Sequence, residues 1–162
     1  MTRITGPFVA IVTPFDRDEN VNAAALRRQV DRQAKSGNGV FCAGTNGEFY
    51  ALSFDEKVQV AATCIEAAAG RVPVLAHIGE VSTQQTIVLG RAIEGLGVKA
   101  VSAITPYFIA CSQAELIDHY RRVADALDTD DRLLGDMLTA QMTLVQVQQN
   151  SDMRRISAYA AL

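Results

Sequence analysis

Residues 39–48 read GVFCAGTNGE, an apolar run that ends in two glycines flanking two small polar residues. A run of this kind is typical of a buried strand that ends in a tight turn. Glycine allows backbone conformations that other residues avoid, so successive N–H groups in such a turn can point at one anion or carboxylate. The stretch therefore predicts a strand with a binding site at its end.

Three further apolar runs, at residues 8–13, 73–78 and 100–105, resemble the run that precedes this turn. All four are continuous rather than alternating, which is typical of strands covered on both faces. Each run is followed by a helical pattern, and two of these patterns open with a capping box, in which a serine is followed three residues later by glutamate. The predicted helices cover residues 23–35, 53–68, 82–94 and 112–127.

The strand–helix unit thus occurs four times, at a spacing of about 30 residues. Parallel strands need a crossover helix between them, so the sequence predicts an α/β fold with a parallel sheet. Two architectures accept this pattern: a doubly wound open sheet and part of a (β/α)8 barrel. The sequence has no G-x-G-x-x-G or Walker-type loop, which weighs against a nucleotide-binding open sheet.

Composition and charge argue against several classes of protein. The chain has 162 residues and a net charge of −3 with both signs mixed, which argues against nucleic acid or an acidic membrane surface as a partner. We see no secretory signal, and no apolar segment approaches the roughly 18 residues of a membrane-spanning helix. The few, widely spaced cysteines and histidines do not predict a metal site, and the cysteine usage favours a reducing cytoplasm.

Distinctive residues stand at all four predicted strand ends. They are Thr13-Pro14-Phe15, the turn at residues 44–48, His77-Ile78-Gly79, and Thr105-Pro106-Tyr107-Phe108. Functional groups in parallel α/β folds gather at the carboxyl ends of the strands. We therefore expect these four groups to meet at one mouth.

With residues 9–15, 44–48 and 104–108, the sequence resembles the dihydrodipicolinate synthase / N-acetylneuraminate lyase family of pyruvate-dependent class I aldolases. The resemblance runs from about residue 6 to residue 128. It implies a (β/α)8 TIM barrel, usually a homotetramer, that needs no cofactor because a lysine forms a Schiff base with pyruvate. Residues 1–127 would then be half a TIM barrel, holding about the first four βα units. Residues 128–162 would be an irregular, non-family tail, either native or the product of truncation or a shifted reading frame.

The resemblance also implies roles for the residues of the turn. The backbone N–H groups of Asn46 and Gly47 would bind the carboxylate of a small 2-oxo acid such as pyruvate. Thr45 belongs to the same substrate-binding turn, and its hydroxyl would relay protons between tyrosines. Tyr107 is a candidate catalytic residue, with a structural role at the strand end as the alternative. We expect Glu48 to be a buried carboxylate that braces the turn.

Two departures from the family pattern limit the activity that can be expected. Phe108 stands where the synthase branch has a second tyrosine, which favours a sugar-acid aldolase or a related lyase. The Schiff-base lysine, which the family carries on its sixth strand, is absent, because the only lysines are Lys35, Lys57 and Lys99. We expect all three to be solvated surface charges. The histidines have structural expectations: His77 as a hydrogen-bonded residue and His119 as a surface or interface residue.

The sequence therefore predicts a lyase-family protein that is inactive alone because its Schiff-base lysine is missing. Two alternatives stay open: a non-catalytic carboxylate-binding or regulatory half-barrel, and a small doubly wound ligand-binding domain. A half-barrel leaves its first and fourth strands as open edges and exposes its inner face. Either the tail covers that face or two copies pair into an eight-stranded ring, so we expect a homo-oligomer.

Overall fold

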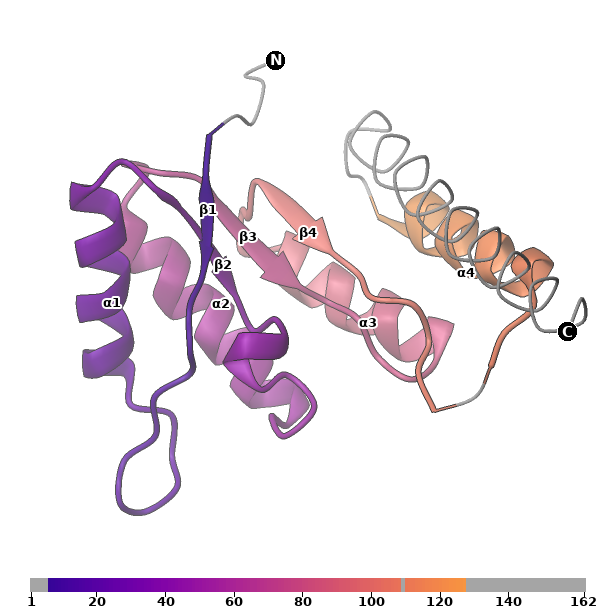
Figure 1. Cartoon of the computed structure of the whole chain (residues 1–162), viewed down its shortest axis with the longest axis horizontal. Coiled ribbons are helices and arrows are strands. Elements are labelled where there is room, and N and C mark those ends of the chain that lie inside the picture. The colour runs from indigo at the N-terminus through magenta and orange to yellow at the C-terminus, as the bar shows by residue number, and fades with distance from the viewer. Residues whose placement is uncertain (1–5, 109, 128–162) are drawn as a thin grey trace, which may run out of the picture. The chain divides into compact units, whose positions relative to one another are not determined.

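The computed structural model describes residues 6–108 and 110–127 (Figure 1). Residues 1–128 form one unit of the chain, and residues 129–162 fall into another. The predicted tail therefore lies outside the described residues. The described elements are β1 (Phe8–Ala10), α1 (Ala23–Lys35), β2 (Gly39–Cys42), the 3-10 helix η1 (Thr45–Gly47), α2 (Phe54–Ala68), β3 (Val74–His77), α3 (Thr83–Glu94), β4 (Ala100–Ser102) and α4 (Gln113–Ala126).

The four strands form one parallel sheet in the order β1-β2-β3-β4. In this register Val9 lies opposite Val40, and Val40 lies opposite Val74. A doubly wound sheet reverses its strand order at a switch point, whereas a (β/α)8 barrel adds each strand beside the one before it. The order within residues 6–108 and 110–127 is that of the barrel, so the doubly wound alternative is wrong.

The core lies between the sheet and its helices. One face of the sheet buries alternate residues of the inner strands against α1 and α2, and Leu127 just after α4 packs close to Gly90 of α3. The fully buried core residues include Leu26, Val30, Val40, Cys42, Val60, Ala61, Cys64, Ala76, Ile78, Leu89 and Ile93. Side chains alternate across a strand, so Phe41, Leu75 and Ala100 lie on the other face, and each of them is only half-buried.

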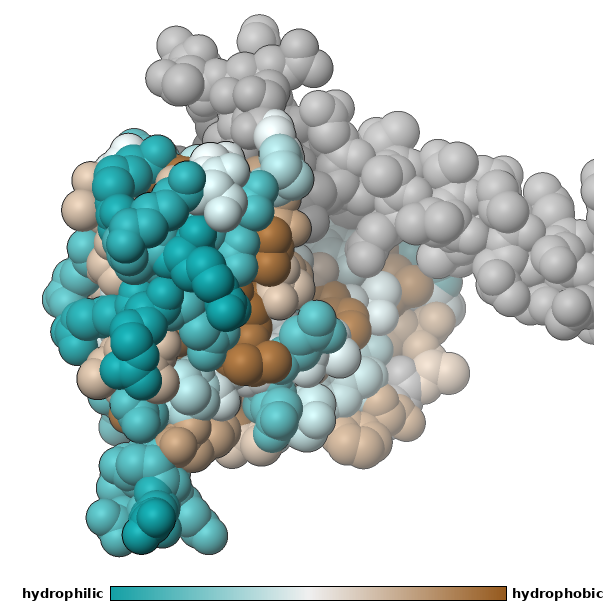
Figure 2. Space-filling view, turned by 60° about the vertical axis from the view of Figure 1, so that its left-hand side comes forward, coloured by the Kyte–Doolittle hydropathy of each residue, from teal (hydrophilic) through white to brown (hydrophobic). Residues whose placement is uncertain are grey.

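The helices begin where the sequence predicts them. The backbone N–H and the hydroxyl of Ser53 both donate to the Glu56 carboxylate at 2.7 Å, and the Glu56 N–H donates to the Ser53 hydroxyl. Ser112 and Glu115 form the same capping box at the start of α4. Among the described helices, none is both long and apolar enough to cross a bilayer. Figure 2 shows mostly hydrophilic surface on the nearer side, with a hydrophobic patch near the middle of the view.

Candidate functional site

The predicted binding turn is the 3-10 helix η1 at the end of β2. The N–H of Gly47 donates to the carbonyl oxygen of Gly44 at 2.9 Å, so this predicted ligand donor is already engaged within the turn. Thr45 and Asn46 come first in η1 and are exposed. The first N–H groups of a helical turn have no acceptor inside that turn. The N–H groups available to a ligand are therefore those of Thr45 and Asn46, rather than those of Asn46 and Gly47.

Close packing against β1 and β2 fixes the position of this turn. The hydroxyl of Thr13, just beyond β1, donates to the carbonyl oxygen of Gly47 at 2.8 Å in a buried contact. A Cβ atom on Gly44 would stand 2.8 Å from the ring of Phe41, so any larger residue there would displace that ring. A Cβ atom on Gly47 would approach the carbonyl oxygen of Ile11 and the hydroxyl of Thr13, both at 3.3 Å. The spacing of the two glycines in the sequence thus has a packing reason.

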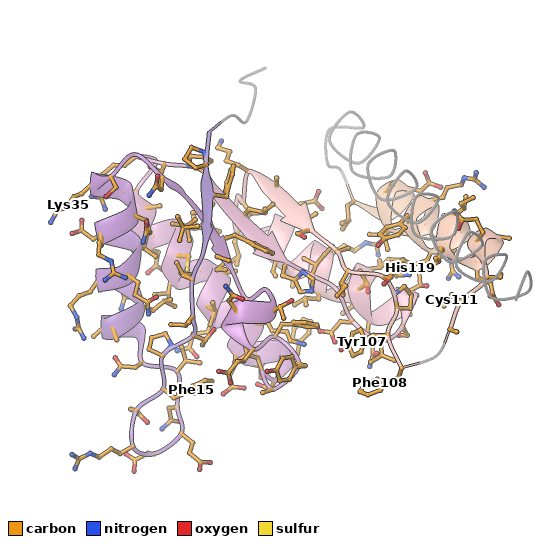
Figure 3. The ribbon with its side chains drawn as sticks, in the orientation of Figure 1. Phe15, Lys35, Tyr107, Phe108, Cys111 and His119 are labelled. Carbon is orange, nitrogen blue, oxygen red and sulfur yellow. The ribbon has the colours of Figure 1, made fainter. Side chains whose placement is uncertain are left out.

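Aromatic contacts join the strand ends into one mouth, as the sequence predicts. The ring of Phe49, which follows η1, lies 4.5 Å from the ring of His77 at the end of β3. The same Phe49 ring meets Tyr107, beyond β4, edge to face at 5.7 Å. Figure 3 shows Phe15, Tyr107 and Phe108 at the same end of the sheet. With Thr13 bonded to Gly47, all four predicted strand ends contribute to this mouth.

His77 is buried in the mouth, with 5% of its surface exposed. Burial, with a smaller contribution from the positive charge of Lys57, lowers the pKa of its imidazole to about 4. The ring is therefore neutral at pH 7. Neither ring nitrogen has a hydrogen-bond partner among the described residues. This differs from the hydrogen-bonded structural histidine that we expected from the sequence.

Lys57 corrects one prediction about the lysines. Lys35 and Lys99 are exposed as predicted, and the Lys35 ammonium pairs with Asp31 on the surface. Lys57 is only 5% exposed, and its ammonium forms an ion pair with the carboxylate of Glu80, in the loop after β3. The prediction of a solvated charge is wrong because a helix that follows a parallel strand begins at the carboxyl edge of the sheet. The first turn of α2 therefore lies at the mouth.

Tyr107 lies next to this ion pair and is half-buried. Burial raises the pKa of its phenol, and the negative charge of Glu80 raises it further. The phenol therefore keeps its proton at neutral pH. Lys57, Glu80, His77 and Tyr107 thus lie together at the mouth. No motif in the sequence pointed to Glu80 as the partner of Lys57.

Two smaller predictions are also wrong. Glu48 is not the buried carboxylate that we expected, because it is exposed. Its backbone is left-handed, with a φ of 56°. His119 is not at the surface: it is buried, and its Nδ1 lies 2.9 Å from the hydroxyl of Thr83 at the start of α3. Within residues 6–108 and 110–127, no three histidine, cysteine or acidic side chains are grouped so that they could hold a metal ion.

The sequence is similar to a known protein family and to characterised members of it. The model of the dihydrodipicolinate synthetase family matches residues 3–156. A 4-hydroxy-tetrahydrodipicolinate synthase of Pelobacter propionicus is 43% identical over 124 residues, which are 76% of this chain and 42% of that protein. An N-acetylneuraminate lyase of Escherichia coli is 36% identical over 128 residues, which are 78% of this chain and 43% of that protein.

The fold also matches solved structures of this family. The dihydrodipicolinate synthase from Acinetobacter baumannii, crystallised in complex with pyruvate, matches with a TM-score of 0.76 and 35% identity. The match covers 78% of this chain and 44% of that one. The chain therefore spans less than half the length of the relatives it matches.

Proposed function

The chain belongs to the dihydrodipicolinate synthetase family, and on this premise we propose that it binds a small 2-oxo acid, such as pyruvate, at the turn of residues 44–47. The N–H groups of Thr45 and Asn46 donate to the carboxylate of the ligand, and the side-chain amide of Asn46 adds a further donor. The observation that carries the proposal is this pair of N–H groups, exposed at the start of η1 and held in place by the buried Thr13–Gly47 hydrogen bond. Preorganised backbone donors bind a carboxylate without moving to meet it.

We propose that the chain holds the ligand without forming an imine. Class I aldolase chemistry requires an unprotonated amine that attacks the ketone carbon, so that the resulting iminium can accept electrons during cleavage or formation of a C–C bond. Lys35 and Lys99 are exposed, and Lys99 precedes β4 at the opposite end of the strands from the mouth. Lys57 lies at the mouth, but its nitrogen is buried and held in an ion pair with Glu80 rather than directed at a ligand on the turn.

Thr45 and Tyr107 are the residues that we propose for proton transfer when a complete lyase site is present. The phenol of Tyr107 keeps its proton at neutral pH and stands beside the ring of Phe49, at the edge of the turn. Phe108 has no proton to pass on, which favours the sugar-acid lyase branch over the synthase branch. The proposed role of this chain is therefore that of a lyase-family carboxylate-binding unit.

We also propose a homo-oligomer in a reducing cytoplasm. Large apolar side chains are exposed around the mouth, among them Phe15, Tyr50, Phe54, Val81 and Phe108. Phe108 is 91% exposed and has a φ of 75°, a conformation that a bulky residue rarely adopts without a compensating contact. The free, buried thiols of Cys42 and Cys64 support the proposal of a reducing compartment.

Titration of the 15N-labelled chain with pyruvate, followed by amide NMR, tests the binding proposal. The expected result is saturable shifts at Thr45 and Asn46. The variant Asn46→Ala keeps the backbone donor and should bind within about fivefold of the parent, since one side-chain hydrogen bond typically contributes about 1 kcal/mol. The variant Gly44→Ala drives a Cβ into Phe41 and should lose binding. Unchanged Thr45 and Asn46 signals at millimolar pyruvate would contradict the proposal.

A further inference from the structure

The buried ring of His77 lies between two phenylalanines at the mouth. The ring of Phe49 meets it edge to face at 4.5 Å, and the ring of Phe41 on β2 meets it edge to face at 6.3 Å. Both arrangements are favourable for aromatic pairs. On a third side, a Cβ atom on Gly79 would stand 2.7 Å from the Nε2 atom of His77, so the backbone of the loop after β3 lies against the ring.

The same two phenylalanines support the two ends of the binding turn. The ring of Phe41 lies against Gly44, where the turn begins. The N–H of Phe49, where the turn ends, donates to the carbonyl oxygen of Gly44 at 3.3 Å. That oxygen also accepts the bond from the N–H of Gly47. His77 therefore contacts the residues that hold the turn closed at both ends.

Packing alone does not require a histidine at this position. A phenylalanine would make the same aromatic contacts without leaving two buried nitrogens unpaired, and such unpaired groups are rare in folded proteins. The property that histidine adds is a positive charge in acid. The charged groups nearest to the ring are the ammonium of Lys57 on α2 and its partner Glu80, while Tyr107 keeps its proton. An imidazolium would therefore be repelled by Lys57, and neither of its N–H groups has an acceptor among the described residues.

We infer that His77 is a positioning residue for the binding turn: its neutral ring keeps Phe41 and Phe49 in the arrangement that closes the turn, and a proton on the ring opens it. A charged ring must move toward water to be solvated, and Phe49 then loses the surface on which it packs. The N–H groups of Thr45 and Asn46 no longer point at one carboxylate once the turn has opened. The effect on pyruvate rests on the proposed function, whereas closure of the turn does not.

Amide hydrogen exchange of the ligand-free chain tests closure of the turn. The N–H groups of Gly47 and Phe49 are bonded within the turn and report its opening, whereas the N–H of Val40 is bonded within the sheet and reports unfolding of the sheet. Comparing each amide between the parent and His77→Phe at one pH removes the intrinsic pH dependence of exchange. We expect equal rates at neutral pH. In acid, Gly47 and Phe49 should exchange faster in the parent, with a midpoint near pH 4, and by a larger factor than Val40 does.

Pyruvate titration followed by NMR tests the consequence for binding. His77→Ala removes both aromatic contacts at any pH and should weaken binding about tenfold, because fewer chains hold the turn closed. His77→Phe should bind like the parent at neutral pH. At pH 4 the parent should bind about twofold more weakly than His77→Phe, since half of its rings are protonated while pyruvate stays ionised. Ile93→Ala is the matched control, because Ile93 is fully buried near the end of α3 that lies farthest from the mouth. It should lose stability in urea and keep its affinity.

Several results would overturn the inference. One is equal acceleration at Gly47 and Val40 in acid, which would mean that the whole sheet unfolds. Another is the same pH response in the parent and in His77→Phe. A third is tighter pyruvate binding by the parent at pH 4, because the imidazolium would then attract the carboxylate directly. If the parent shows no pyruvate-dependent shifts while exchange at Gly47 follows the charge of His77, the proposed function fails and the positioning role is supported.

Discussion

Removing either partner of the Lys57–Glu80 ion pair is expected to destabilise the fold strongly. The pair joins the first turn of α2 to the loop after β3, and its side chains are 6% and 17% exposed. Replacing one member leaves the other as an unpaired charge in a site that water barely reaches. The loss should therefore exceed the value of the pair itself, because desolvation of the remaining charge is no longer offset.

The two single variants should differ in size because the two side chains differ in exposure. Removing one partner of a fully buried pair costs about 3 to 5 kcal/mol. Glu80→Gln strands the more deeply buried ammonium, so we expect a loss of about 3 kcal/mol. Lys57→Met strands a carboxylate that still reaches some water, so we expect about 2 kcal/mol. The double variant Lys57→Met/Glu80→Gln leaves no charge behind and should lose only about 1 kcal/mol, less than either single change.

Urea unfolding followed by circular dichroism, at one fixed protein concentration, measures these free energies. Lys35→Met is the matched control, because the Lys35 side chain is 73% exposed and its pair with Asp31 lies in solvent. A surface pair of this kind contributes less than about 0.5 kcal/mol. A loss from Lys57→Met no larger than that from Lys35→Met would show that the buried pair carries no such penalty. So would two single losses that simply add in the double variant.

Three further outcomes follow from the geometry of the mouth. Because the pKa of His77 lies near 4 in the fold and near its ordinary 6.5 in the unfolded chain, the unfolded chain binds the extra proton between these values. The free energy of unfolding should therefore fall as the pH drops from 6.5 to 4, by roughly 3 kcal/mol more in the parent than in His77→Gln. Urea unfolding of both proteins across this pH range measures the difference. Gly79→Ala should lower the free energy of unfolding by about 2 kcal/mol, because its Cβ would stand 2.8 Å from the backbone nitrogen of Ile104. A loss near zero in thermal unfolding would show that the loop shifts to make room. Thr13→Val leaves the buried Gly47 carbonyl without its donor and should weaken pyruvate binding several-fold in calorimetry, whereas unchanged affinity would remove Thr13 from the support of the turn.

The sequence carries strong local signals for the elements of this fold. Apolar runs of Val, Ile and Ala mark the strands, and the serine–glutamate capping boxes place the starts of α2 and α4 at the residues where they occur. The runs overestimate strand length, because the residues past each strand remain apolar while they turn toward the mouth. The order of the strands depends on packing between distant segments, and the sequence alone left the barrel and the doubly wound sheet both open.

Some features of the site depend on neighbouring residues in the sequence, and others depend on residues that are far apart in it. The glycine pair predicts the turn because backbone conformation and close approach are local requirements. The partner of Lys57 lies 23 residues away on another loop, and no periodic pattern connects the two. The Gly47 N–H is bonded to the carbonyl oxygen of Gly44, and the ring nitrogens of His77 have no partner among the described residues. Both facts depend on the three-dimensional structure, so residue spacing could not predict them.

We propose that this chain holds a 2-oxo acid at its turn and forms no imine with it. The most direct test is the intact mass of the folded chain after incubation with pyruvate and borohydride, which reduces any imine to a stable adduct. We expect an unchanged mass under conditions in which NMR shows pyruvate bound at Thr45 and Asn46. A mass increase of one reduced pyruvate that peptide mapping places on Lys57, and that Lys57→Arg abolishes, would contradict it.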